Sequence, residues 1–276
     1  MSWLEPNAPL MRGLRLTAVS LAVLFLTGLL AYPLERGAWK RVSANLNELR
    51  VEEVESALGQ GVILGVLGGF RTLMADLLFI RMYTHWEKKE WTKVEALMPV
   101  LTSVDPRSLY FWINANRIVA YDIPVMRIRE INAGFKRAGS DRVLTPEEEQ
   151  AIHAEQGLKA IDSLQQGLTY HPDESTLMQD IASTYLNKVG DVEKAAEWYL
   201  RAWQTPTRRY YQARLHAQLV YNLGRVQEAL DFLIAHYREI PKDAPYARAS
   251  VVLERIREME DELGLPESER FQPDAP

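Results

Sequence analysis

The chain has 276 residues, of which 47% are apolar and 25% are charged, and its formal net charge is -5. These are the proportions of a globular protein long enough to bury a sizeable core, and the negative balance gives no electrostatic reason to expect nucleic acid as a partner. The absence of cysteine excludes disulfides, thiolate metal sites and cysteine nucleophiles.

The first predicted element is a single transmembrane helix at residues 16–34, preceded by an N-terminal tail at 1–15. Its sequence, LTAVSLAVLFLTGLLAYPL, has no charge, and as a helix it would extend about 28 Å, close to the hydrocarbon thickness of a bilayer. A cleaved signal peptide is the alternative. The length of the apolar run and the lack of a small-residue cleavage motif after it favour an uncleaved anchor. Basic residues flank both ends, so the distribution of charge leaves the orientation open.

Residues 35–72 are predicted to form a juxtamembrane helix and a glycine-rich corner. Apolar residues at helical spacing predict an amphipathic helix over 41–58. The uncharged run at 59–70, GQGVILGVLGGF, is too short to span a bilayer and lacks the lysine of a phosphate-binding loop. It therefore has two interpretations, a closely packed structural corner or a segment that contacts the bilayer. The apolar helix expected after it, at 73–83, is predicted to be buried.

Helices of similar length, separated by glycine and proline breaks, are predicted from residue 73 to residue 243, and no segment shows the alternation of a strand. The interval from Gly190 to Gly224 equals the interval from Ala195 to Ala229, which gives a 34-residue period. A turn glycine, a small residue five positions later and a proline at the end of the unit resemble the tetratricopeptide repeat (TPR), whose units are helix-turn-helix pairs. Ala202 fits the packing pattern of the second helix, whereas His236 departs from it. The resemblance implies an all-α chain with an α-solenoid of such repeats.

Weaker units extend the pattern in both directions. Residues 86–106 and 147–172 have the same cadence, and the extra length between them predicts an insertion at about 123–147. A charged helix at 244–264 is expected to cap the array, and residues 265–276 are expected to be a disordered tail. The GGFR sequence at 68–71, followed by an apolar helix and a weak repeat unit, resembles membrane-anchored TPR proteins of bacterial envelopes over about residues 60–265.

In that family the first helices of the repeats line a groove that holds a protein ligand. Gly190 and Gly224 set the register, which places these residues in the groove: Asp180, Thr184, Asn187, Lys188, Tyr211, Arg214, Gln218, Tyr221 and Asn222. The earlier unit, whose register these glycines do not set, is expected to contribute Tyr110, Arg117 and Tyr121. Rigid aromatic side chains, arginine forks and adaptable amides suit a peptide-binding surface. A solvated helix face would have the same composition, so that interpretation stays open.

No constellation of residues predicts catalysis, a metal or a cofactor. The five histidines are scattered, and none belongs to a recognised metal-binding spacing. The expected function is that of a membrane-anchored scaffold, which binds a protein and positions it in an envelope assembly for transport, secretion or pilus-type work. The alternative is an obligate subunit of a larger membrane complex with its groove permanently occupied. The expected location is the bacterial inner membrane, with the repeats expected on the periplasmic side. The expected partners are proteins and the bilayer, and nucleic acid is not expected. Contact with the bilayer is expected through 16–34 and, in one interpretation, also through 59–70.

Overall fold

The computed structural model describes residues 19, 23, 70–241 and 244–273. The predicted anchor, apart from Val19 and Val23, and the predicted helix at 41–58 lie outside these residues. Within the described part, no helix is both long enough and apolar enough to cross a membrane.

The described residues form helices and no strand. Two short segments are π-helical and two are 3-10 helical. In chain order the elements are α3 (Arg71–Glu87), α4 (Trp91–Val104), α5 (Leu109–Arg117), η1 (Ile118–Asp122), α6 (Ile123–Arg137), α7 (Pro146–Leu168), α8 (Ser175–Thr184), η2 (Tyr185–Val189), α9 (Val192–Trp203), α10 (Tyr210–Asn222), α11 (Val226–Glu239), η3 (Pro245–Ala247), α12 (Ala249–Glu262) and η4 (Glu267–Glu269). The all-α prediction is confirmed for the described residues.

The chain divides into two compact units, Met1–Phe111 and Trp112–Pro276, with the boundary inside α5. In the first unit α3 packs on α4. Only one side of α3 takes part, because Ala75, Leu78 and Met82 are buried while Leu77 and Ile80 on another side are exposed. The prediction that the 73–83 helix is buried is therefore correct for Ala75, Leu78 and Met82 and wrong for the side that carries Leu77 and Ile80.

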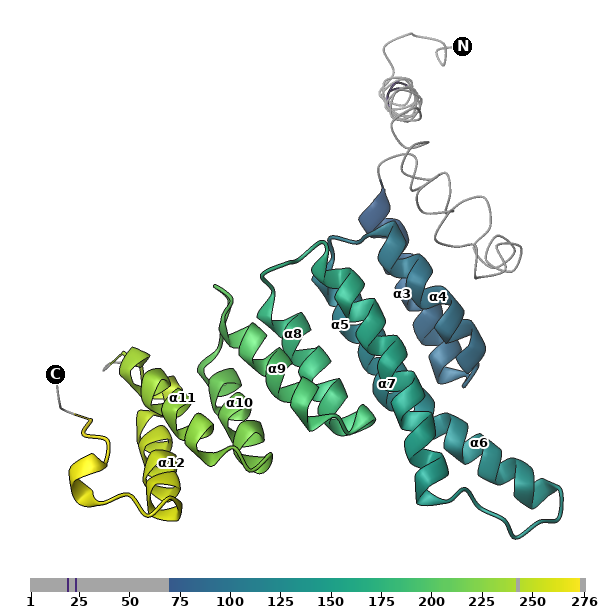
Figure 1. The fold of residues 1–276 in the computed structure, drawn as a ribbon. Coiled ribbons are helices and arrows are strands. Elements are labelled where there is room, and N and C mark those ends of the chain that lie inside the picture. The colour runs from purple at the N-terminus through teal and green to yellow at the C-terminus, as the bar shows by residue number, and fades with distance from the viewer. Residues whose placement is uncertain (1–18, 20–22, 24–69, 242–243, 274–276) are drawn as a thin grey trace, which may run out of the picture. The chain divides into compact units, whose positions relative to one another are not determined.

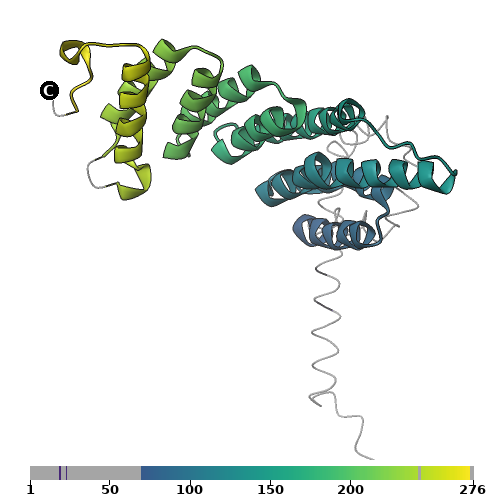
Figure 2. The same cartoon turned by 90° about the horizontal axis from the view of Figure 1, so that it is seen from below.

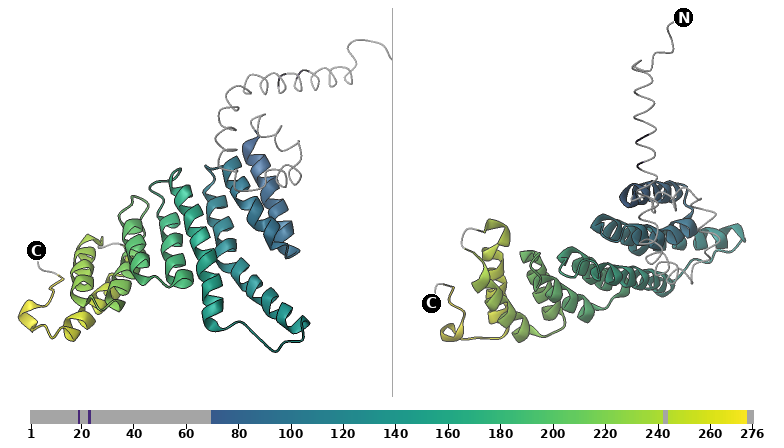
Figure 3. Two further views of the ribbon diagram at one scale, coloured as in Figure 1. Left: turned by 45° about the vertical axis from the view of Figure 1, so that its right-hand side comes forward. Right: turned by 90° about the horizontal axis from the view of Figure 1, so that it is seen from above.

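In the second unit each helix from α7 to α12 contacts the next one along the chain, as in a helical solenoid (Figure 1). The two views of Figure 3 and the view from below in Figure 2 show the same succession from α8 to α12. Helices two places apart also meet, since the Tyr211 hydroxyl on α10 bonds to Gln179 on α8. Alternate helices therefore form a common surface.

Positions one repeat period apart in the second unit have equivalent structures. Gly190 and Gly224, each at the turn between two helices, have φ angles of 82° and 78°. This left-handed conformation closes the preceding helix and is strained for residues with a side chain. Ala195 and Ala229, five positions later, are both fully buried. The small side chains allow close contact between the helices of a pair.

The segment between the weaker and the stronger repeats contains a helix of its own. The predicted insertion at 123–147 comprises α6, a connecting loop and the first residues of α7, which begins with a capping box between Thr145 and Glu148. Further along α7, Gly167 packs on the indole of Trp112, which a Cβ there would approach to 3.0 Å. Glycine at this position therefore serves close packing.

The C-terminal end differs from the prediction of a disordered tail at 265–276. Residues up to Pro273 are described, and Phe271 is buried against the ring of Tyr237 on α11. The backbone amide of Phe271 donates to the Glu260 carboxylate over 2.5 Å, and Arg270 is 2.6 Å from Asp261. One aromatic anchor and two charged contacts hold this stretch on the last helices.

Candidate functional site

The predicted groove residues lie on the first helix of each pair. Tyr110 belongs to the first unit, where its ring meets Phe79 edge-on. The other residues belong to the second unit, on α5 and η1, on α8 and η2, and on α10. The structure brings most of these into two neighbouring groups.

The first group joins α5 and η1 to α8 and η2. Arg117 Nη2 lies 3.4 Å from Asp180 Oδ2, although 63 residues separate the two in the sequence. The Lys188 ammonium lies 4.4 Å from the centre of the Tyr121 ring, in cation–π geometry. These four residues, with Tyr199 of α9 behind them, are called the Asp180 cluster below.

Tyr199 connects the cluster to the interior of the unit. Its hydroxyl shares a hydrogen bond of 2.9 Å with the Ser183 hydroxyl. Burial raises the pKa of Tyr199, and Tyr121, Tyr211 and Asp180 raise it further through their charges. Side chains from three successive first helices therefore lie within electrostatic range of one hydroxyl.

The charges of the Asp180 cluster are partly removed from water. Burial raises the pKa of the Asp180 carboxyl, and the opposing effect of Arg117 does not cancel it. Burial also lowers the pKa of Lys188, against an opposing contribution from Asp122. Holding a carboxylate and an ammonium in this environment costs folding free energy. Perturbed pKa values of this kind cluster at functional sites.

Two π-helical turns position the cluster. Tyr121 lies in η1, while Asn187 and Lys188 lie in η2. The Gln150 side-chain amide donates to the Lys188 carbonyl over 2.8 Å, which satisfies a carbonyl at the end of the turn. Gly157 of α7 approaches the same turn so closely that a Cβ there would be 2.9 Å from Lys188 Cβ. π-helical turns are frequent at functional sites. Here α7 holds η2 in place through the contacts of Gln150 and Gly157.

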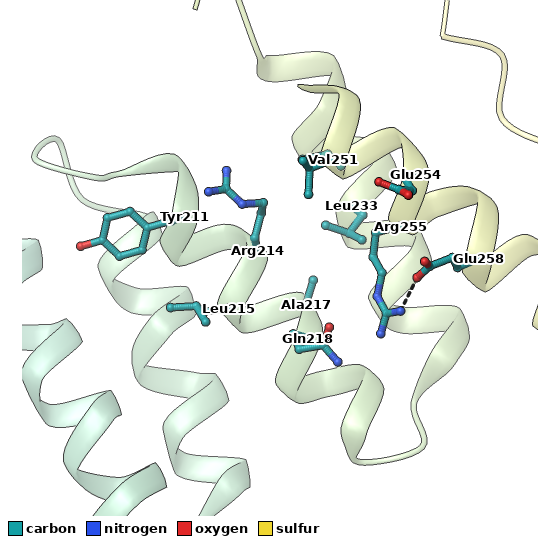
Figure 4. A pocket seen from close by; sticks show the side chains of 11 residues that line it. Tyr211, Arg214, Leu215, Ala217, Gln218, Leu233, Val251, Glu254, Arg255 and Glu258 are labelled. Atoms are coloured by element: carbon teal, nitrogen blue, oxygen red, sulfur yellow. Dashed lines mark hydrogen bonds and ion pairs between the residues drawn. The ribbon is translucent and has the colours of Figure 1, made fainter. Parts of the chain in front are cut away.

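The second group forms a groove of about 420 Å³ between α10 and α12 (Figure 4). Its apolar floor includes Ala217 and Leu233, and polar side chains stand on both walls. The lining residues are Tyr211, Arg214, Leu215, Ala217, Gln218, Leu233, Val251, Val252, Glu254, Arg255 and Glu258. We call it the α10–α12 groove.

The charges of the α10–α12 groove are unequally neutralised. Arg255 is paired with Glu258, and its guanidinium lies 4.3 Å from the centre of the Tyr221 ring. Arg214 instead donates to the neutral backbone carbonyl of Ala247 over 2.8 Å. Burial lowers the pKa of Arg214, and the charge of Arg248 lowers it further. The Arg214 end of the groove is therefore a place where an anionic group would be stabilised.

Tyr211 links the two groups. Its ring lines the α10–α12 groove, and its hydroxyl donates to the Gln179 side chain on α8. Gln212, the next residue, reaches the same Gln179 oxygen over 3.3 Å. A ligand lying along the first helices would meet both groups in sequence.

Some predicted groove residues have other positions. Thr184 is buried and donates to the Asp180 carbonyl, so its hydroxyl is not available to a ligand. Tyr221 donates to Glu262 over 2.7 Å. Gln218 lines the α10–α12 groove and also donates to Asn222 over 2.8 Å. Asn187 is exposed in the middle of η2.

Sequence reasoning missed the wall that α12 contributes. Val252 and Arg255 lie one repeat period after Gln218 and Tyr221, so continuing the register by one unit would have placed both in the groove. Gln179 and Ser183 were also missed. They adjoin predicted positions on α8, and no feature of their own sequence distinguishes them.

The arrangement is suited to binding. Among the described residues no three histidine, aspartate or glutamate side chains are grouped as a metal site would require. The His216 ring bonds to the Ala196 carbonyl, and the His85 ring bonds to Glu90, so both have local structural partners. No model of a known protein family matches the chain, and no curated protein matches it in sequence. Function is therefore inferred from the residues themselves.

Proposed function

We propose that the chain is a membrane-anchored scaffold of TPR-like repeats that binds a protein partner along the Asp180 cluster and the α10–α12 groove. It would position that partner in a bacterial envelope assembly of the transport, secretion or pilus type. Residues 16–34 would be the anchor in the inner membrane, with the repeats on the periplasmic side. The 34-residue period and its equivalent turns support the repeat assignment.

One observation carries the binding proposal, namely that side chains from successive first helices converge on one surface. Arg117, Asp180 and Tyr211 come from α5, α8 and α10, and each makes a contact that crosses from one of these helices to another. A surface that is only solvated has no need of partly buried charges, because their burial costs stability. A partner that supplies hydrogen bonds and counter-charges would recover this cost.

The chemistry of the surface indicates a polar peptide with apolar side chains as the ligand. The floor of the α10–α12 groove accepts an aliphatic or aromatic side chain, and Arg214 accepts an acidic group beside it. Tyr121 and Tyr211 provide rigid aromatic area, which contributes binding free energy with little loss of rotamer entropy.

The proposal is tested with a photo-crosslinking amino acid in the full-length chain, expressed in the cells that normally make it. The photoreactive residue replaces Tyr121 in one variant and Gln218 in another, one in each group. Arg201 is the matched control, because it is exposed and lies two residues after Tyr199, about 200° around the same helix. We expect one protein to be captured at both groove positions and not at Arg201. Capture of different proteins at each position, or equal capture at Arg201, would contradict the proposal.

A second candidate function is an obligate subunit of a membrane complex. The exposed apolar side of α3 favours it, since an obligate subunit exposes a large apolar face when its neighbours are missing. In that case the full-length chain would be recovered only with stoichiometric companions, and its groove would not exchange ligand. Purification in mild detergent, followed by native mass spectrometry, distinguishes a free scaffold from a fixed subunit.

A further inference from the structure

Among the described residues of the first unit, the apolar side of α3 stays exposed. Phe70, Leu73, Leu77 and Ile80 follow one another at spacings of three and four residues, which is one side of a helix. Their side chains are 46%, 52%, 49% and 61% exposed. We call this surface the α3 stripe. A contiguous apolar surface on a folded unit indicates an interaction site.

The sequence just before the stripe contains a segment with a matching face. Residues 41–58 have Leu46, Leu49, Val54 and Leu58 at the spacing of an amphipathic helix. Such a helix is stable in water only when its apolar side is covered. The segment and the α3 stripe therefore each have an apolar side that needs to be covered.

The connection between them is long enough to reverse the chain. Eleven residues, 59–69, separate Leu58 from Phe70, and extended they reach about 36 Å. The stripe is only about 15 Å long, at about 1.5 Å per helical residue from Phe70 to Ile80. Five of the eleven are glycines, which allow the backbone to turn sharply.

The charges of the two segments are opposite. Residues 70–89 contain four basic and two acidic residues, whereas residues 41–58 contain two basic and four acidic residues. The net charges of about +2 and about −2 favour association of the two segments. An anionic bilayer would be attracted by α3 as well but would be repelled by the neighbouring segment.

We propose that residues 41–58 form a helix that lies antiparallel along the α3 stripe and covers it. Leu58 then lies near Phe70 and Leu46 lies near Ile80. The inference is independent of the proposed partner-binding function, because it concerns the first unit alone. It would remove the observation that favours an obligate subunit.

Paired cysteines test the proposal, since the chain has no cysteine of its own. Two double variants of the full-length chain match the antiparallel arrangement, Val54→Cys with Leu73→Cys and Leu46→Cys with Ile80→Cys. Exchanging the partners gives matched controls with the same four cysteines, Val54→Cys with Ile80→Cys and Leu46→Cys with Leu73→Cys. After mild oxidation, we expect intramolecular disulfides to form at least tenfold faster in the first two variants than in the controls. Equal rates in all four, or faster rates in the exchanged pairs, would overturn the proposal.

A second measurement separates the other possible occupants of the stripe. Leu77→Cys is labelled with a water-soluble maleimide in the full-length chain, with exposed Thr72→Cys on another side of α3 as the control. We expect Leu77→Cys to react at least tenfold more slowly than Thr72→Cys, and to become reactive when Leu46, Leu49 and Val54 are changed together to serine. Protection that survives the serine changes would mean that lipid or another molecule covers the stripe. Disulfide-linked dimers of the single Leu77→Cys variant would identify a second copy as the occupant. Either result would overturn the proposal.

Discussion

His236 lies one repeat period after Ala202, and both side chains are buried at the equivalent place on their helices. The repeat pattern requires a small residue there, and the larger imidazole is accommodated by aromatic rings. The centre of the His236 ring lies 4.8 Å from that of Trp203, edge-on, and 6.0 Å from that of Tyr210. Neither of its nitrogens has a hydrogen-bond partner among the described residues. A buried ring without partners is a site that does not tolerate a charge.

The stability of the chain should therefore fall in mildly acidic solution because of His236. Burial, with added effects of Arg214 and Arg208, lowers its pKa from 6.5 to about 4. The unfolded chain binds a proton below pH 6.5, whereas the folded chain does so only near pH 4, so acid favours unfolding across this window. The shift corresponds to roughly 3 kcal/mol lost between pH 6.5 and pH 4. Above pH 6.5 this contribution is constant.

The His236→Leu variant provides the check. Urea unfolding of the parent and the variant between pH 7 and pH 4 gives the free energy of unfolding at each pH. We expect the variant to lose about 3 kcal/mol less than the parent over this range, since leucine cannot be protonated. Equal losses in the two proteins would assign the acid sensitivity to other groups.

Asp180 is expected to reduce stability while supporting binding. Its pKa is raised in the folded chain, so the fold favours the protonated carboxyl and the ionised form present at neutral pH is a cost. Asp180→Asn should therefore raise the melting temperature at pH 7, with a smaller effect at pH 4, where more of the carboxyl is protonated. The same change should weaken partner capture at Tyr121 by about tenfold or more, because a charge-assisted contact is lost.

Exposed Asp162→Asn is the control for both measurements. A lower melting temperature for Asp180→Asn would show that the pair with Arg117 stabilises the fold.

The repeat period accounts for much of what could be predicted from the sequence. Because a fixed period repeats the same local packing, it placed the two turn glycines and the buried alanines at equivalent positions. It also placed Asp180 of α8 and Arg214 of α10 at equivalent positions of successive units. Period and helical spacing are properties of the chain itself, so they can be read without coordinates.

Other features could not be predicted, because they depend on contacts between distant segments. Thr184 was expected in the groove, but Gly157 of α7 approaches it, and a Cβ at Gly157 would be 3.4 Å from Thr184 Cγ2. The unit containing α7 departs from the repeat period, so register could not reveal this contact. The π-helical form of η1 and η2 also has no pattern in the sequence, since it differs from an α-helix by one residue in a turn.

The close approach of α7 to η2 can be tested by adding one methyl group. In Gly157→Ala the new Cβ would be 2.9 Å from Lys188 Cβ, so η2 would have to shift. We expect a loss of about 1–3 kcal/mol, as for other additions to a packed core, together with weaker partner capture because Lys188 moves. Gly134→Ala in α6 is the matched control. No atom lies within 4 Å of its Cβ, so the change should stabilise the helix by up to about 1 kcal/mol. Thermal unfolding of both variants measures the change in the free energy of unfolding. Equal changes in Gly157→Ala and Gly134→Ala would contradict a close contact between Gly157 and η2.

Phe271 should contribute to stability although it lies beyond the last α-helix. Its ring is buried on Tyr237, and Arg238 lies 5.5 Å from the ring centre. Its amide also satisfies the carboxylate of Glu260, a residue only 1% exposed. Phe271→Ala should therefore destabilise the chain by about 3 kcal/mol, the lower end of the range for a buried phenylalanine, since the site is at the edge of the fold.

The exposed neighbour Gln272→Ala is the control and should change the free energy of unfolding by less than about 0.5 kcal/mol. Deleting residues 266–276 should cost at least as much as Phe271→Ala, because Glu260 then keeps only Arg257 as a partner among the described residues. Urea unfolding measures all three. An effect of Phe271→Ala no larger than that of Gln272→Ala would mean that the tail does not hold α11 and α12 together in solution.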